Sequence, residues 1–163
     1  MTSSTTRLES REPYALDPDQ VFREHYPQVY RLALSMAGNP ADAEDISQET
    51  FLAVFRGLKS FRGDALISTW IYRITVRVAT RWLARRGPVR EPSFTEGRAD
   101  APIPIDLISA LQRLPVTSRM IIGLVAVEGL SHREVAELLG IPEGTVASRL
   151  FTARKRLTEL LGD

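Results

Sequence analysis

The chain has 163 residues, of which 44% are hydrophobic and 25% charged, and its formal net charge is +1. This length and composition are typical of a folded protein with one or two small domains, and they exclude a large multidomain enzyme, a fibrous protein and a disordered one. There is no cysteine, which excludes disulfides, thiolate metal sites and thiol nucleophiles.

Other simple patterns narrow the class further. The two histidines, His25 and His132, stand too far apart in sequence to suggest a metal-ligand pair, so we expect no metal site. No apolar stretch approaches the roughly 18 residues that a membrane span needs. The Ser/Thr-rich N-terminal stretch lacks the apolar segment of a secretory signal. We therefore expect a cytoplasmic protein with no membrane insertion and a disordered tail over residues 1–17.

Charge is distributed unevenly along the chain. Four carboxylates crowd the stretch from residue 42 to 49, namely Asp42, Glu44, Asp45 and Glu49. The stretch from residue 70 to 90 holds six arginines and no acidic residue. Of the 21 basic residues 19 are arginine, whose planar guanidinium suits phosphates and base edges. A GC-rich genome would explain the abundance of arginine but not its clustering, so we predict an acidic surface and a basic surface close together in sequence.

Apolar residues recur at helical spacing almost throughout, and no alternating run indicates a sheet, so we predict an all-α fold. The first helix carries one apolar stripe, which consists of Phe22, Tyr26, Val29, Ala33 and Met36. Pro27 is expected to begin or kink this helix, and Gly38, Asn39 and Pro40 are expected to end it.

The second helix is predicted to open near Ala41, with carboxylates in its first turns where the helix dipole favours them. Its predicted buried face consists of Ala43, Ser47, Phe51, Val54, Phe55 and Leu58. A short loop at residues 61–64 then leads into a third helix, which runs to about Arg86 and stops at Gly87 and Pro88.

The third helix carries a ridge of arginines spaced four residues apart: Arg73, Arg77, Arg81 and Arg85. Like charges at this spacing repel, so the ridge favours an anionic partner, with a merely solvated face as the alternative. On the packed side we expect Ile74, Val78 and Leu83. Trp70, Tyr72 and Trp82 are candidates either for stacking on bases or for packing in the core.

Residues 87–105 hold four prolines and two glycines and show no helical stripe, which predicts an extended linker. Helical periodicity resumes after it. We infer two small helical domains, residues 18–86 and 106–163, joined by this flexible linker.

The second domain contains a helix-turn-helix pattern. Ser131 and Glu134 have the spacing of a capping box, Gly140 permits a turn, and Val146 is placed to pack the second helix on the first near Ala136. The predicted buried stripe of the second helix is Val146, Leu150, Ala153, Leu157 and Leu160. Facing outward are Ala147, Ser148, Arg149, Phe151, Thr152, Arg154 and Lys155, a set able to contact phosphates, base edges and thymine methyls. The alternative is a generic helical hairpin.

Two stretches of the chain resemble a known family. Residues 41–86 look like region two, and residues 107–161 look like region four, of the extracytoplasmic-function (ECF) class of bacterial sigma factors. With the first helix, the resemblance covers about nine tenths of the chain, in the family's order and with a linker in the family's place. It implies the family's fold, two helical domains on a flexible linker.

The resemblance also implies roles for individual residues. The DxxQExxL pattern, made by Asp45, Gln48, Glu49 and Leu52, would dock on the β′ clamp helices of RNA polymerase. The loop of Phe61, Arg62, Gly63, Asp64 and Ala65 would hold a base flipped out of the minus-ten element. The following helix, with Trp70, Tyr72, Arg73 and Arg77, would help melt the duplex. The segment that reads the minus-thirty-five element would comprise Ser148, Arg149, Phe151 and Thr152, with Arg154 and Lys155 on the same outer face.

Three positions depart from the commonest family pattern. Arg77 and Arg81 stand where many members carry Asn and Asp, and Ala147 stands where a basic residue is usual. These departures affect which promoter sequence the chain would recognise more than whether it acts as a sigma factor.

The function implied is that of an alternative sigma factor, which binds core RNA polymerase through the β′ clamp helices and the β flap and directs it to promoter DNA. Such a factor is no enzyme, needs no cofactor and is commonly controlled by an anti-sigma factor. An autonomous helix-turn-helix regulator is the alternative; the acidic docking face and the second nucleic-acid surface argue against it. An enzyme on a helical scaffold would need a catalytic pair or phosphate-binding loop that the sequence lacks.

Overall fold

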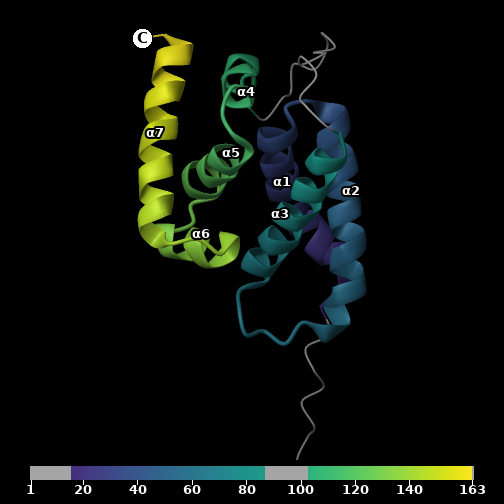
Figure 1. Ribbon diagram of the computed structural model, residues 1–163. Coiled ribbons are helices and arrows are strands. Elements are labelled where there is room, and N and C mark those ends of the chain that lie inside the picture. The colour runs from purple at the N-terminus through teal and green to yellow at the C-terminus, as the bar shows by residue number, and fades with distance from the viewer. Residues whose placement is uncertain (1–15, 87–102, 163) are drawn as a thin grey trace, which may run out of the picture.

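The structure is a computed structural model that describes residues 16–86 and 103–162. Every regular element in this described part is a helix, which confirms the all-α prediction. Figure 1 shows two groups of helices side by side, with α1 (Pro18–Ala37), α2 (Pro40–Gly57) and α3 (Ile67–Arg86) in one group. The other group consists of α4 (Ile105–Gln112), α5 (Val116–Ile122), α6 (His132–Leu139) and α7 (Glu143–Leu161). We call these the first and second halves.

Two of the predicted segments fall mostly outside the described residues. Of the expected tail, only Leu16 and Asp17 are described, and Asp17 caps α1 by accepting a hydrogen bond from the Asp19 amide at 3.0 Å. Of the expected linker, residues 103–105 are described. Ile103 is buried in the core and Ile105 already begins α4, so the ordered second half starts before residue 106.

The first helix is longer than its proline suggested. Pro18 occupies the first turn, where its missing amide costs nothing, and Gly38 ends the helix in a left-handed conformation (φ 81°). Pro27 lies inside α1 and does not begin it, which corrects one of the two expectations for this residue.

The predicted buried face of α2 is correct except at Phe55. This ring is 38% exposed, whereas Ile46 and Thr50, which the prediction omitted, are fully buried. The reason is geometric: α2 packs against both α1 and α3, so the buried face is broader and centred differently from a single stripe. A short 3₁₀ turn, η1 (Leu58–Ser60), follows α2 and leads to the loop before α3.

The second half contains the predicted helix-turn-helix. Ser131 and Glu134 form the full capping box at the start of α6, and Gly140 ends α6 in the left-handed region (φ 67°). Val146, Leu150 and Ala153 of α7 are buried, as their spacing predicted. Before α6, helix α5 widens into a π turn, η2 (Gly123–Val127), in which the amide of Glu128 donates to the carbonyl of Gly123.

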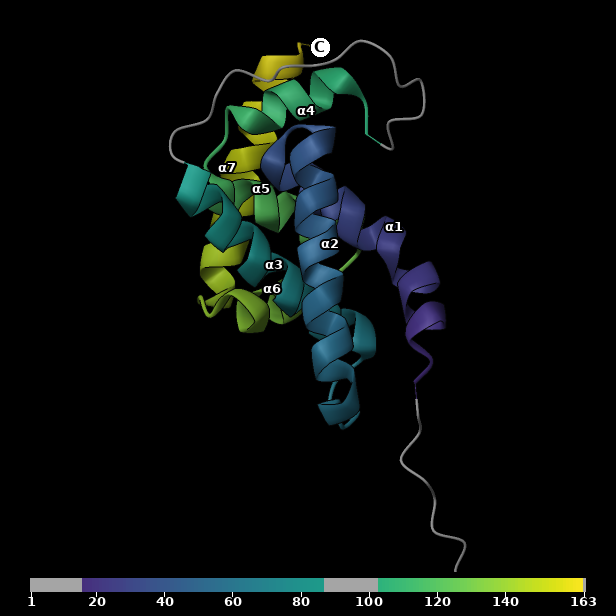
Figure 2. The ribbon, with the colours of Figure 1, turned by 90° about the vertical axis from the view of Figure 1, so that its right-hand side faces the viewer.

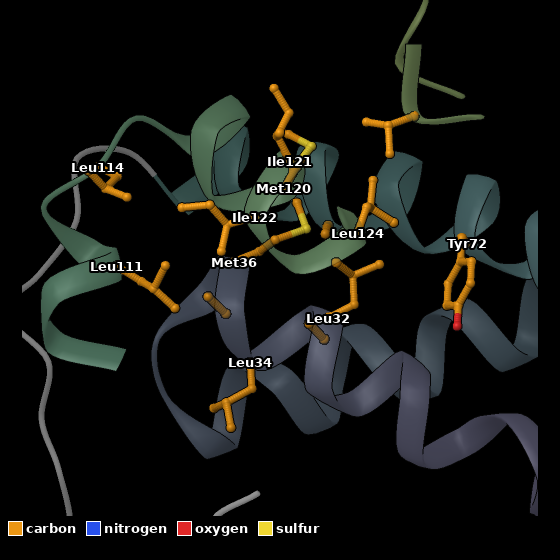
Figure 3. Close-up of a cluster of buried hydrophobic side chains, with 14 of the residues drawn as sticks. Leu32, Leu34, Met36, Tyr72, Leu111, Leu114, Met120, Ile121, Ile122 and Leu124 are labelled. Carbon is orange, nitrogen blue, oxygen red and sulfur yellow. The ribbon is translucent and has the colours of Figure 1, made fainter. Parts of the chain in front are cut away.

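One hydrophobic core runs through both halves. It joins Leu32 and Met36 of α1 with Ile121, Ile122 and Leu124 of the second half, as Figure 3 shows. Helix α1 contacts α4, α5 and η2, and α3 contacts α6. A second, smaller cluster lies among α1–α3 alone, around Val21, Val29, Phe51 and Ile71. No sequence pattern indicated that the two halves would pack directly against each other.

Candidate nucleic-acid and protein interfaces

The outer face of α2 presents the first group of predicted site residues. Asp45, Gln48 and Leu52 are exposed and Glu49 is half-exposed. Their spacing of three and four residues places them on one side of the helix, which lies at the front in Figure 2. Leu52 is 55% exposed and adds an apolar side chain to this face.

Fewer carboxylates are exposed on this face than the run of four in the sequence suggested. Asp42 is buried, caps the start of α2 together with Asn39, and forms an ion pair with Arg86 of α3. Glu44 and Glu49 are both half-buried, so Asp45 is the one fully exposed carboxylate of these four.

Aromatic rings that the sequence analysis missed extend this face. Phe55 is 38% exposed, and Phe22 of α1 is 40% exposed with its ring 6.5 Å from that of Phe55. Phe22 also packs on the buried ring of Phe51 at 5.0 Å. Phe55 was predicted on the buried face of its helix and Phe22 in an apolar stripe, and periodicity does not distinguish the edge of such a stripe from its centre.

The loop predicted to bind a flipped base lies between η1 and α3. Arg62, Gly63, Asp64 and Ala65 are all exposed, and Gly63 adopts a left-handed conformation (φ 76°) that disfavours other residues. Phe61 is half-buried with its ring 5.0 Å from that of Trp70. Trp70 in turn packs so closely on Gly57 that a Cβ there would stand 2.9 Å from the ring.

The arginine ridge of α3 faces solvent along its whole length. Arg73, Arg77, Arg81 and Arg85 are exposed, while Val78 and Ala79 on the other side are buried. Trp82 is half-buried, packs against the shared core, and holds its indole N–H buried without a hydrogen-bond partner. All three aromatic candidates on this helix therefore lie in packed positions, Tyr72 and Trp82 at the shared core and Trp70 at the smaller cluster.

Tyr72 is the predicted site residue whose surroundings differ most from expectation. It is 4% exposed, and its hydroxyl donates a hydrogen bond to Oε2 of Glu128 at 2.9 Å. Arg31 of α1 donates to the same carboxylate from Nε at 3.2 Å and from Nη2 at 3.3 Å. Burial, followed by the negative charge of Glu128 and the hydrogen bond to it, raises the pKa of Tyr72 above its usual range. Sequence reasoning missed both Arg31 and Glu128.

The outer face of α7 carries the last group. Ser148, Arg149, Phe151, Thr152, Arg154 and Lys155 are all exposed, and the Phe151 ring reaches 73% exposure. The opposite side of the helix packs on α4, α5 and α6. In Figure 1 this helix lies at the edge of the molecule farthest from α2. Helix α7 is therefore an exposed helix with a basic and hydroxyl-bearing face, and it is the second helix of the helix-turn-helix.

Metal chemistry has no candidate site in the part of the chain that is described. Across residues 16–86 and 103–162, no three His, Asp or Glu side chains gather where they could hold an ion. No described helix is long and apolar enough to cross a membrane.

Comparison with known proteins identifies the class. Residues 21–88 match Sigma-70 region 2, and residues 105–157 match Sigma-70 region 4. These two ranges correspond to the first half, with α1–α3, and the second half, with α4–α7. The chain is therefore built as a sigma-70-type protein that carries both regions.

Individual relatives narrow the class to a family. The chain is 39% identical over 150 residues to the ECF RNA polymerase sigma factor SigM of Mycobacterium tuberculosis, covering 88% of this chain and 76% of SigM. It is 34% identical over 157 residues to the ECF RNA polymerase sigma factor SigE of Mycolicibacterium smegmatis, covering 88% of this chain and 61% of SigE, so it spans under two thirds of that relative. The chain belongs to the ECF family of RNA polymerase sigma factors.

A solved structure supports the same fold. The sigma factor RpoE from Bartonella quintana, in complex with the anti-sigma factor NepR, matches with a TM-score of 0.75 and 26% sequence identity. The match covers 88% of this chain and 95% of RpoE.

Proposed function

We propose that this chain is a cytoplasmic alternative sigma factor, which binds core RNA polymerase and directs it to a restricted set of promoters without catalysing a reaction itself. One observation carries the proposal: two separate exposed faces, acidic and apolar on α2 and basic on α7, lie on halves that match the two sigma regions. A free-standing DNA-binding regulator has a use for the second face but none for the first.

In this proposal the α2 face docks on polymerase. Leu52 supplies the apolar contact, with Phe55 and Phe22 beside it, while Asp45 and Glu49 pair with basic groups of the polymerase. Gln48 lies on the same side, where it can exchange hydrogen bonds with the partner. We propose the clamp helices of the β′ subunit as the docking partner of this face.

Promoter DNA contacts the two other surfaces. The exposed loop at residues 61–65 and the arginines of α3 bind the minus-ten region, where the positive ridge follows the phosphates of the separated strand. The outer face of α7 enters the major groove at the minus-thirty-five element. There Arg149 and Ser148 reach base edges, Phe151 and Thr152 offer apolar contact to thymine methyls, and Arg154 and Lys155 bind phosphates.

An anti-sigma factor is the second partner that we propose. The likeness to RpoE, which was solved bound to NepR, supports it. A protein that competes with core polymerase for the purified chain would be the expected finding. Recovery of polymerase subunits alone under every growth condition would contradict this part of the proposal.

The experiment that tests the main proposal is run-off transcription. Purified chain is mixed with core polymerase and a pooled genomic promoter library, and transcripts that depend on the chain are sequenced. Specific start sites with shared upstream elements are expected. If no transcripts appear and the chain alone shifts specific duplexes, an autonomous regulator replaces the sigma factor.

The docking face has a matched pair of variants. Leu52→Ala is expected to weaken binding to core polymerase about tenfold, which corresponds to about 1.4 kcal/mol. Leu161→Ala removes a leucine of similar exposure at the end of α7 and is expected to leave the affinity unchanged. Equal loss in both variants would remove the α2 face from the proposal.

A further inference from the structure

The packing between the two halves is close enough to fix their arrangement. Gly123 of η2 lies against α1, where an added Cβ would stand 3.0 Å from both the Leu32 side chain and Oγ of Ser35. Just beyond the C-terminal end of α1, the side chain of Gln112 from α4 fills the space where a Cβ of Gly38 would be. Contacts this tight exist only when the halves sit in this one closed arrangement.

Glu128 is the polar group on which the closed arrangement depends. Its side chain is only 3% exposed, although it stands at the end of η2 in the second half. Its two carboxylate oxygens accept hydrogen bonds from Arg31 and Tyr72, which belong to two different helices of the first half. A buried carboxylate is costly unless it is paired, and Glu128 loses both of these partners when the halves separate.

The second half also buries polar groups that lack hydrogen-bond partners, and one of them, in Gln112, lies at the contact with α1. Arg119 of α5 is 2% exposed, and its guanidinium donates to Oε1 of Gln112 at 2.6 Å while its Nε has no partner. The Nε2 of Gln112 is likewise buried without a partner. Burial lowers the pKa of Arg119, which marks the cost of keeping this cation away from solvent. Because Gln112 lies against Gly38 of α1, separation of the halves would expose its buried amide to water, which offsets part of the stabilisation that Glu128 provides.

Glu128 stabilises the contact between the halves, whereas the unpaired amide of Gln112 favours their separation. We propose that the closed packing of the two halves is an autoinhibited state of this chain, latched by Glu128, and that opening of the latch releases Tyr72 for promoter DNA. The proposal rests on the proposed function, because it gives Tyr72 a second role on the minus-ten surface. While the latch is closed, the Tyr72 hydroxyl and most of its ring are taken up by Glu128 and the shared core. The α2 and α7 outer faces stay exposed in the same state, so the latch controls the use of α3 and not the first encounter with either partner.

The absence of cysteine makes the latch directly measurable in the full chain. Arg56→Cys on α2 and Thr158→Cys on α7, both at exposed positions, introduce one pair of spin-label sites on opposite halves. Pulsed electron–electron distance measurement on the free protein is expected to give one narrow distribution. Adding Glu128→Ala is expected to move a large part of the population to longer, broader distances.

Two further variants separate the latch from general damage. Tyr72→Phe keeps the ring and removes one hydrogen bond, so it should give a smaller shift in the same direction. Glu137→Gln, which removes an exposed carboxylate from α6, should leave the distribution unchanged. Helix content by circular dichroism is compared for all variants. An unchanged distribution in a folded Glu128→Ala variant, or a broad distribution in the parent chain, would overturn the proposal.

A binding assay ties the latch to Tyr72. A single-stranded oligonucleotide with the minus-ten sequence is titrated with the free chain, and removal of the latch should tighten binding. If the open fraction rises from about a tenth to about a half, the apparent affinity rises about fivefold. Combining Glu128→Ala with Tyr72→Ala should abolish most of that gain, and equal gain in the double variant would contradict the role of Tyr72.

The outcomes distinguish this proposal from the function on which it rests. Promoter-specific transcription with no change in the distance distribution would retain the sigma function and remove the latch. A clear opening in Glu128→Ala, in a chain that supports no transcription with core polymerase, would retain the latch and remove the sigma function.

Discussion

The two candidate DNA surfaces of this chain differ in what lies behind and beside them. The outer face of α7 is free along its whole length, and only the opposite side of that helix is packed. Helix α3 has two different sides, since its arginines face solvent while Tyr72 bonds to Glu128 of the second half and Trp82 packs on the shared core. The outer face of α7 can therefore bind DNA without any rearrangement of the protein. The surface of α3 depends on how the two halves are arranged.

The largest effect is expected where the two halves meet. Leu124 is fully buried in the shared core beside α1. Leu124→Ala should lower the free energy of unfolding by about 2–5 kcal/mol, because it leaves a cavity that the packed surroundings cannot fill. The measurement is urea denaturation followed by tryptophan fluorescence.

The fluorescence probe gives this test its value. Both tryptophans, Trp70 and Trp82, belong to the first half, whereas the substitution is in the second. Val127→Ala, at a 45% exposed position of the same π turn, is the control and should change little. If the fluorescence transition stayed in place while circular dichroism showed the second half unfolding early, the halves would be independent and the comparison above would fail.

The next effect concerns the free surface. Arg149→Ala should weaken binding to a duplex with the minus-thirty-five element by about 1–3 kcal/mol if its guanidinium contacts a base. Arg133→Ala removes another exposed arginine, which lies on α6 and pairs with Glu137, and should cost little. Binding is measured by fluorescence anisotropy at one fixed salt concentration, since ionic strength alone changes such affinities. An unchanged affinity of the Arg149→Ala variant for this duplex would show that Arg149 does not contact the element.

Alkaline pH tests the shared surface. The pKa of Tyr72 is raised above that of an unfolded tyrosine, which is about 10, first by burial and then by Glu128. Above about pH 10 the unfolded chain releases a proton that the folded chain retains. The free energy of unfolding should therefore fall by up to about 1.4 kcal/mol per pH unit, while the contribution is fully present below that pH.

Tyr72→Phe supplies the control for this pH dependence. It removes the titrating group, so part of the alkaline loss of stability should disappear. Some dependence should remain, because burial and Glu44 also raise the pKa of Tyr26. Identical alkaline profiles for the two proteins would mean that Tyr72 is not held in the buried position described above.

The smallest effect is a purely local one. Ser131→Ala removes the side chain that accepts the Glu134 amide at 3.1 Å and should destabilise the fold by about 1 kcal/mol. Thermal unfolding followed by circular dichroism measures it. Ser131→Asp keeps an acceptor at the cap and should restore most of the loss. If Ser131→Asp were as unstable as Ser131→Ala, the lost stability would not come from the hydrogen bond at the helix cap.

Structure that depends on contacts between residues close in sequence could be predicted, and structure that depends on distant contacts could not. The helix-turn-helix was predicted in detail because its signals are local: a capping box, a glycine after α6, and buried positions at helical spacing in α7. The outer residues of α7 followed from that stripe by elimination. Their contacts with DNA stay a prediction.

The misplaced residues have a common cause. Phe55 was assigned to a buried face and Phe22 to an apolar stripe, but both rings are exposed, and the way α1 packs on α2 decides which edge of a stripe is covered. Arg31 and Glu128 are 97 residues apart, and neither stands in a pattern that distinguishes it from an ordinary surface charge. Contacts between distant segments depend on how the elements assemble, which periodicity along one helix does not contain.

The direction in which the Glu128 side chain points depends on the number of residues in the π turn η2. A π turn holds one residue more than the corresponding α-helical hydrogen-bonded turn, and here it ends at Glu128. Each residue of a helix advances the chain by about 100°. Loss of a single residue between Gly123 and Val127 would therefore rotate Glu128 away from Arg31 and Tyr72 without altering any side chain that takes part. A one-codon deletion could in this way disconnect the two halves of the protein while leaving every candidate DNA-contacting residue in place.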